Sequence, residues 1–180
     1  MNAEDKRTEQ AVRHRIVDAY LELLKDRESE AIPVTEIAQK AGVSRMTFYR
    51  KFSSKRDVVD FYLGGIMHWE VAWDPEKNAE GSIWDLEYGI RFFRVMQKYR
   101  ETILLLVKRG YATLLLRVIN LTNECNAGDM PQSSIDRYDL YFLAGAGFNA
   151  MLIWLMDGCK ETPEEMAGAL KEHIQAKRQG

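Results

Sequence analysis

Residues 34–49 read VTEIAQKAGVSRMTFY, and this stretch decides the prediction of the fold. Ile37 and Ala41 recur at the spacing of one helical face. Gly42 then stands where a left-handed backbone conformation ends a helix most easily, and Ser44 follows as a residue that caps a second helix. The stretch therefore predicts two short helices joined by a glycine turn, which is a helix-turn-helix.

The second of these helices presents polar side chains on its outer side. Phe48 anchors the helix to the core, which leaves Met46, Thr47, Tyr49 and Arg50 on or near the outer face. Hydroxyl, phenol and guanidinium groups on one short helix suit a DNA major groove that is flanked by phosphates. The pattern therefore favours binding of nucleic acid.

The charge distribution points to the same place. The 180-residue chain has a formal net charge of −2, yet Val43–Arg56 holds five basic residues and no acidic one. Such a local excess indicates an anionic partner. On charge alone, a solvated basic helix face is an equally good interpretation.

The wider run IAQKAGVSRMTFYRKFSSKRDVV, residues 37–59, resembles the DNA-binding signature of the TetR family of bacterial regulators. The resemblance implies a three-helix DNA-binding domain over residues 1–54 and a ligand-binding, dimerising domain over residues 55–180. It also implies phosphate contacts by Tyr49 and Lys55, and it places Thr35, which can cap the first helix, near the DNA. The full set of expected DNA-binding residues is Thr35, Ser44, Arg45, Thr47, Tyr49, Arg50, Lys51 and Lys55.

The rest of the chain predicts helices throughout, so the expected fold class is all-α with about nine helices. No alternating strand pattern or hairpin turn is present, and apolar spacing predicts a first helix from about Thr8 to Lys25. Later helix starts carry a Ser/Thr-x-x-Asp/Glu capping box, in which hydroxyl and carboxylate satisfy backbone N–H groups reciprocally. These boxes are Ser54–Asp57, Ser82–Asp85, Ser133–Asp136 and Thr162–Glu165.

An uncharged apolar stretch lies near the C-terminal end. Leu140–Met156 is 17 residues long and contains Asn149, and its flanking charges show no positive-inside asymmetry. Burial in protein is therefore favoured over insertion into a membrane. By the family resemblance, helices at about residues 133–158 and 162–177 form a four-helix dimer bundle. The expected interface residues are Gly145, Phe148, Leu152 and Leu155.

An aromatic stripe suggests a ligand pocket, because Trp84, Tyr88, Phe92 and Met96 recur every four residues. Ordinary core packing explains the stripe as well, and only the family resemblance raises the pocket interpretation to an equal footing. Tyr111 and Asn149 are the further expected pocket residues. The scarcity of charges on these faces favours a small apolar or aromatic effector.

Other classes of protein lack support in the sequence. The three histidines form no H-x-x-x-H pair, and neither a phosphate-binding glycine loop nor a nucleophile motif occurs, so no catalytic residue, metal site or cofactor is expected. Two distant cysteines cannot build a disulfide framework, and the N-terminal residues do not form a signal peptide. A cytoplasmic protein is expected.

The leading hypothesis is a ligand-responsive homodimeric transcriptional regulator, most often a repressor in this family, that binds palindromic operator DNA. A protein–protein co-regulator of the same fold that does not itself bind DNA is the alternative from a different class. The retained Tyr49 and Lys55 argue against it. A helical carrier of small molecules with a vestigial motif is a third hypothesis.

Overall fold

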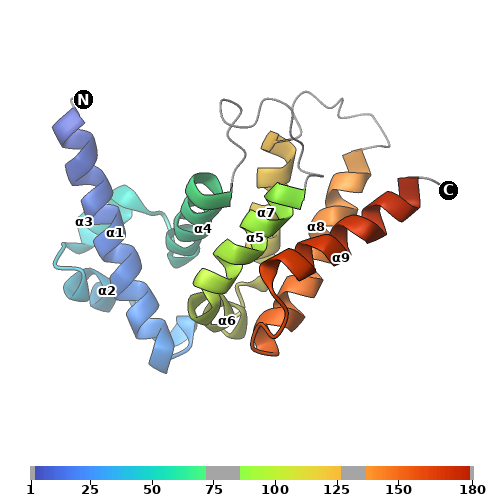
Figure 1. The fold of residues 1–180 in the computed structure, drawn as a ribbon. Coiled ribbons are helices and arrows are strands. Elements are labelled where there is room, and N and C mark those ends of the chain that lie inside the picture. The colour runs from blue at the N-terminus through green and yellow to red at the C-terminus, as the bar shows by residue number, and fades with distance from the viewer. Residues whose placement is uncertain (1–2, 72–85, 127–136, 179–180) are drawn as a thin grey trace. The chain divides into compact units, whose positions relative to one another are not determined.

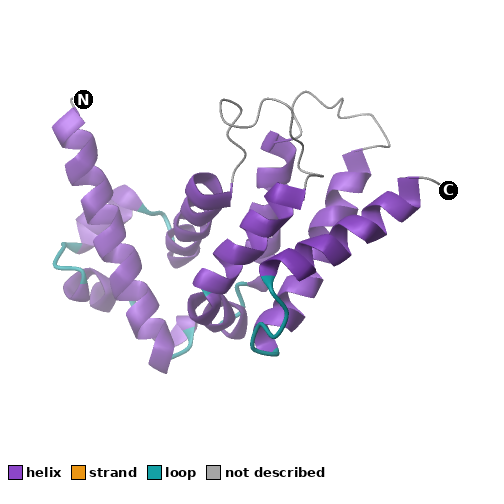
Figure 2. Ribbon diagram, in the orientation of Figure 1, coloured by secondary structure: helices purple, strands orange, loops and turns teal. Residues whose placement is uncertain are grey.

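The computed structural model describes residues 3–71, 86–126 and 137–178, and every regular element within them is a helix (Figures 1 and 2). Nine α-helices, one short 3-10 helix and one π-helical segment lie in these described ranges. The prediction of an all-α fold is therefore confirmed. Trp84 and the expected capping boxes Ser82–Asp85 and Ser133–Asp136 lie outside the described residues.

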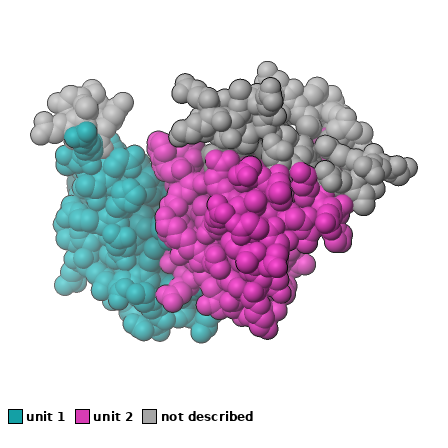
Figure 3. Space-filling model, in the orientation of Figure 1, with its two compact units in different colours: residues 1–62, 105–111 teal, residues 63–104, 112–180 magenta. Residues whose placement is uncertain are grey.

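The chain divides into two compact units, which Figure 3 distinguishes by colour. Unit 1 contains Met1–Tyr62 together with Leu105–Tyr111, and unit 2 contains Leu63–Leu104 and Ala112–Gly180. The short segment 105–111 is thus joined to unit 2 through the backbone at both of its ends. The expected domain division between residues 54 and 55 stays a prediction.

Unit 1 is built on a helical trio followed by the start of a fourth helix. Its elements are α1 (Ala3–Asp26), the 3-10 helix η1 (Ser29–Ala31), α2 (Val34–Lys40), α3 (Arg45–Lys51) and α4 (Lys55–Ile66). Helix α2 packs against both α1 and α3. The core is apolar and includes the fully buried Ile16, Tyr20, Leu24, Ile37 and Phe48.

The turn between α2 and α3 has the conformation that its sequence predicts. Gly42 has a φ of +65°, and its N–H donates to Gln39 O at 3.1 Å while Val43 N–H donates to Ala38 O at 2.9 Å. These two bonds form a Schellman motif, which satisfies the last carbonyls of α2 and turns the chain sharply. The glycine is required here because a side chain at positive φ adds strain.

Unit 2 holds the longer helices of the C-terminal part. Its elements are the end of α4, the π segment η2 (Met67–Val71), α5 (Leu86–Lys98), the first half of α6 (Arg100–Lys108), α7 (Ala112–Asn126), α8 (Arg137–Met156) and α9 (Pro163–Arg178). Helix α5 packs extensively on α9, and α7 packs on α8 (Figure 1). A Cβ at Gly89 would lie 3.1 Å from the Cβ of Ala167, so the absent side chain permits the close approach of α5 and α9.

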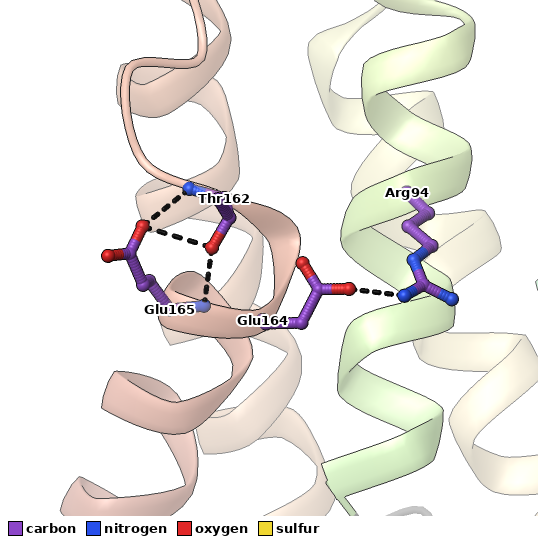
Figure 4. A network of polar contacts seen from close by, with 4 residues as sticks. All are labelled: Arg94, Thr162, Glu164 and Glu165. Carbon is purple, nitrogen blue, oxygen red and sulfur yellow. Dashed lines mark hydrogen bonds and ion pairs between the residues drawn. The ribbon is translucent and has the colours of Figure 1, made fainter.

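The start of α9 is fixed by the predicted capping box (Figure 4). Thr162 N–H donates to Glu165 Oε2 at 2.7 Å, and Glu165 N–H donates to Thr162 Oγ1 at 3.2 Å. The backbone hydrogen bond from Thr162 lowers the pKa of the Glu165 carboxyl. An ion pair between Glu164 and Arg94 links the first turn of α9 to α5. The Ser54–Asp57 box is also formed, because Asp57 Oδ2 accepts from Ser54 N–H at 3.0 Å.

The helix that follows the helix-turn-helix changes its conformation along its length. The α conformation ends at Ile66, and the π segment η2 continues to Val71. The change follows Gly64 and Gly65, which lack the side chains that stabilise an α-helix interior.

Candidate nucleic-acid interface

Helix α3 turns one face inward and the other outward. Phe48 is fully buried, whereas Tyr49 is 51% exposed and Met46 is 81% exposed. Arg45 and Arg50 are exposed as well, and within the described ranges they form no ion pair. The outer face of α3 therefore combines two cationic side chains with a phenol and a thioether.

The two hydroxyl residues of α3 are engaged with one another. Ser44 caps the helix as predicted, since its Oγ accepts from Thr47 N–H at 3.0 Å. The Ser44 and Thr47 hydroxyl oxygens lie 3.0 Å apart. These contacts stabilise the first turn of α3, where backbone N–H groups otherwise lack partners.

Lys51 is held by an acidic side chain of α1. Its Nζ lies 2.8 Å from Glu9 Oε1, and its side chain is only 12% exposed. The hydrogen bond and charge of Lys51 lower the pKa of the Glu9 carboxyl. Lys51 therefore ties α3 to α1, a role that the sequence interpretation did not include.

Lys55 is also engaged within unit 1. Its Nζ donates to Ile32 O at 2.9 Å and to Ser29 O, which belong to the C-cap and to the first residue of the 3-10 helix η1. An ammonium group has three donors, so these two carbonyls leave one hydrogen for another acceptor. Lys55 thus fixes the chain that leads into α2, and its expected phosphate contact stays a prediction.

Thr35 does not cap α2, so this part of the sequence interpretation is wrong. The helix begins one residue earlier, at Val34, and Pro33 occupies the cap position without a side-chain hydrogen bond. Pro33 O accepts from Glu36 N–H at 3.0 Å. Proline at the cap sets an extended backbone, which moves Thr35 into the first helical turn, where it is exposed.

Tyr111, an expected pocket residue, lies in unit 1. Its hydroxyl oxygen is 2.7 Å from that of Tyr20 and 3.1 Å from Ser29 Oγ. Two residues earlier, Arg109 Nε donates to Leu24 O at 2.8 Å, at the end of α1. The segment 105–111 is therefore fastened to the residues that precede α2.

The other expected pocket residues divide by burial. Tyr88, Phe92 and Met96 are buried on α5, whereas Asn149 is exposed. Tyr88 donates its hydroxyl hydrogen to Asn123 Oδ1 at 2.9 Å. Asn123 is buried, and the sequence interpretation missed it because a single asparagine in an apolar helix carries no distinctive pattern.

A surface hollow of about 380 Å³ lies on a neighbouring face of α5. It is lined by Glu87, Ile90, Arg91, Arg94 and Val95. None of these five residues belongs to the expected pocket. The sequence interpretation followed the aromatic stripe and passed over the arginines beside it.

Helix α8 is apolar on both its buried and its exposed sides. Leu155, an expected interface residue, is fully buried, while Gly145, Phe148 and Leu152 are partly exposed. The exposed apolar side chains include Phe142, which is 64% exposed, together with Ile153 and Met156. By length and composition α8 is the one described helix that could cross a membrane, although a core helix passes the same test.

Comparison with known proteins places this geometry in a family context. Residues 16–60 match the model of the bacterial regulatory proteins of the tetR family. No curated protein sequence matches the chain. Among solved structures, a TetR transcriptional regulator from Streptococcus agalactiae 2603V is 18% identical with a TM-score of 0.63, and the alignment covers 96% of this chain and 99% of that one.

Two further structures have the same fold. A TetR transcriptional regulator from Rhodococcus sp. RHA1 is 19% identical with a TM-score of 0.56, over 92% of this chain and 94% of that one. NalD, the secondary repressor of the MexAB-OprM multidrug efflux pump in Pseudomonas aeruginosa, is 20% identical with a TM-score of 0.53, over 93% and 95%. At these identities the likeness concerns the fold, while the sequence match lies in the helix-turn-helix region. Residues 16–60 therefore match the DNA-binding region of the tetR family, and the chain as a whole shares the fold of solved TetR regulators.

Proposed function

We propose that this protein is a homodimeric, ligand-responsive repressor that binds palindromic operator DNA through α3. The observation that carries the proposal is the outer face of α3, where Arg45, Tyr49 and Arg50 are exposed opposite the buried anchor Phe48. A helix that is fastened by one buried aromatic residue and presents cations outward suits insertion into a major groove. NalD, which has the same fold, is a repressor, and this supports repression as the sign of regulation.

The contacts divide by their chemistry. Arg45 and Arg50 have the planar, five-donor group that reads guanine or binds phosphate in two places at once. The Tyr49 hydroxyl can donate a hydrogen bond to a phosphate oxygen at the side of the groove. Lys55 is the first residue of α4, and its remaining donor is proposed to bind a phosphate oxygen as well.

The outer side of α8 supports the proposed dimerisation. Phe142, Ile153 and Met156 are each more than half exposed on one helix, and a second copy of the chain would cover them. A Cβ at Gly145 would meet no atom of the isolated chain, which leaves room for a partner helix there. A symmetric pair then presents two copies of α3 to half-sites about 34–36 Å apart.

The effector is proposed to bind unit 2. The hollow on α5 is large enough for a small molecule and combines apolar Ile90 and Val95 with charged Glu87, Arg91 and Arg94, of which Arg94 is paired with Glu164. A small apolar or aromatic compound fits the apolar part of this lining. Tyr88, Phe92 and Met96 are buried on α5, so they could contact the effector only if α5 moved when the effector bound.

Operator binding is tested by mobility shift at several salt concentrations, with the DNA that flanks the gene and with a randomised DNA pool. Arg50→Ala should weaken binding and lower the slope of log affinity against log salt by about 1. Lys160→Ala, which removes an exposed cation from the other unit, should change neither value. If no DNA is retained at low salt, the co-regulator hypothesis replaces this proposal.

Dimerisation is tested separately by light scattering. Phe142→Glu places a charge on the outer side of α8 and should produce monomers of unchanged helicity. Leu121→Glu is the matched control, because Leu121 is an exposed apolar residue of α7. If both variants remain dimers, the interface lies elsewhere.

A further inference from the structure

One apolar side chain stands at the centre of the cationic face of α3. Met46 is 81% exposed, which is unusual beside two arginines on a helix of seven residues. Successive residues of an α-helix are rotated by about 100°, so Met46 lies about 160° from the buried Phe48. Arg50 lies at the same angle on the other side, so Met46 and Arg50 are the two side chains of α3 that point most directly away from the core.

The neighbours of Met46 frame it on both sides. By the same rotation, Arg50 lies about 40° to one side and Tyr49 about 60° to the other. Both of these side chains are exposed. If α3 enters a major groove with this face inward, Met46 is the apolar group that meets the base edges.

Base edges in the major groove offer this side chain one apolar partner. Guanine, adenine and cytosine present hydrogen-bond donors and acceptors there, whereas thymine adds a C5-methyl group. A thioether is flexible and polarisable, so it can adapt its packing to that methyl group. A methionine at this place has no strong hydrogen bond to offer any other base.

We propose that Met46 is a specificity-determining residue that selects a thymine within each operator half-site by contact with the thymine methyl group. The proposal rests on the proposed DNA-binding function and adds a base preference to it. Arg45 and Arg50 are too polar to supply this discrimination, and Thr47 lies about 100° round the helix from Met46, with its hydroxyl bonded to Ser44. Part of the base specificity of this interface therefore comes from an apolar contact.

The test starts from the half-site selected out of random DNA by the full-length protein. Each thymine of that site is replaced in turn by deoxyuridine, which lacks only the methyl group. At one thymine per half-site the wild-type protein should lose about fourfold in affinity, the value expected for one buried methyl-sized group. Met46→Ala should bind the thymine and deoxyuridine sites equally, and Met46→Leu should retain the preference.

Leu121→Ala serves as the control, because it removes an exposed apolar side chain from α7 and should leave the thymine preference intact. Two outcomes overturn the inference in distinguishable ways. If the protein binds DNA but no deoxyuridine replacement depends on Met46, the inference is wrong and the proposed function stands. If the protein selects no DNA, both are wrong.

Discussion

Replacing Lys55 by methionine separates a structural role for this residue from a role in DNA binding. Methionine keeps an unbranched side chain of similar length and removes the ammonium group. The variant thus loses the hydrogen bonds to Ile32 O and Ser29 O of the η1 segment. Both carbonyls lie in the segment 29–32 that leads into α2, so the effect should be greatest in the helix-turn-helix.

The magnitude follows from the type of bond and its surroundings. A hydrogen bond from a charged donor contributes about 1.5–3 kcal/mol when it is buried. Lys55 is half-buried, so water replaces part of what is lost. We therefore expect unit 1 to be destabilised by about 2 kcal/mol in total. For a urea dependence of roughly 2 kcal/mol per molar, the midpoint should fall by about 1 M.

The assay has to report on unit 1 alone. The four tryptophans of the chain, at positions 69, 73, 84 and 154, all lie outside unit 1, so tryptophan fluorescence is unsuitable. Amide hydrogen exchange over residues 29–52, measured across a urea series, follows the local opening directly. Arg56→Met is the matched control, because Arg56 is an exposed neighbour that forms no ion pair among the described residues.

The result that refutes this reasoning is equal protection of α2 in Lys55→Met and Arg56→Met. The hydrogen bonds of Lys55 would then contribute nothing measurable to the stability of unit 1. A second measurement addresses the DNA: if the third donor of Lys55 binds phosphate, Lys55→Met should also lower the salt slope of operator binding by about 1. Loss of stability with an unchanged slope would restrict Lys55 to its structural role.

Three other predictions follow from contacts in the two units. Burial raises the pKa of the Tyr20 hydroxyl above its ordinary value near 10, so the stability that this hydroxyl contributes is complete below pH 10 and is lost as the pH rises further. Denaturation across pH 8–11 should therefore show a loss of stability above pH 10 that is larger in the wild type than in Tyr20→Phe. Thr162→Ala removes the cap of α9 and should lower the stability of unit 2 by about 1 kcal/mol, as measured by urea denaturation followed at Trp154, while Thr113→Ala, an exposed threonine of α7, should not. A compound that releases operator DNA should, in calorimetry, bind the free protein more tightly than the protein–operator complex. The ratio of these two affinities should equal the factor by which the compound weakens DNA binding, and equal affinities would mean that it does not act through the protein's conformation.

The sequence by itself determined the local structure. Gly42 and Ser44 fix the turn and the start of α3 through backbone conformation and capping, which depend on neighbouring residues only. The same holds for the capping box at Thr162 and for the all-helical fold, because helical periodicity is visible along the chain. The inward place of Phe48 was predictable for the same reason.

Tertiary structure decided the partners of the polar side chains. Nothing in the sequence near Lys55 shows that its ammonium meets carbonyls more than twenty residues away, or that Lys51 pairs with Glu9 of α1. Likewise Tyr111 belongs with Tyr20 in unit 1, although the sequence interpretation placed it in the ligand pocket. Helix α8 is apolar all round, so periodicity could not tell that Leu155 faces the core and Phe142 faces outward. Such contacts depend on how distant helices pack, and a one-dimensional pattern carries no record of that packing.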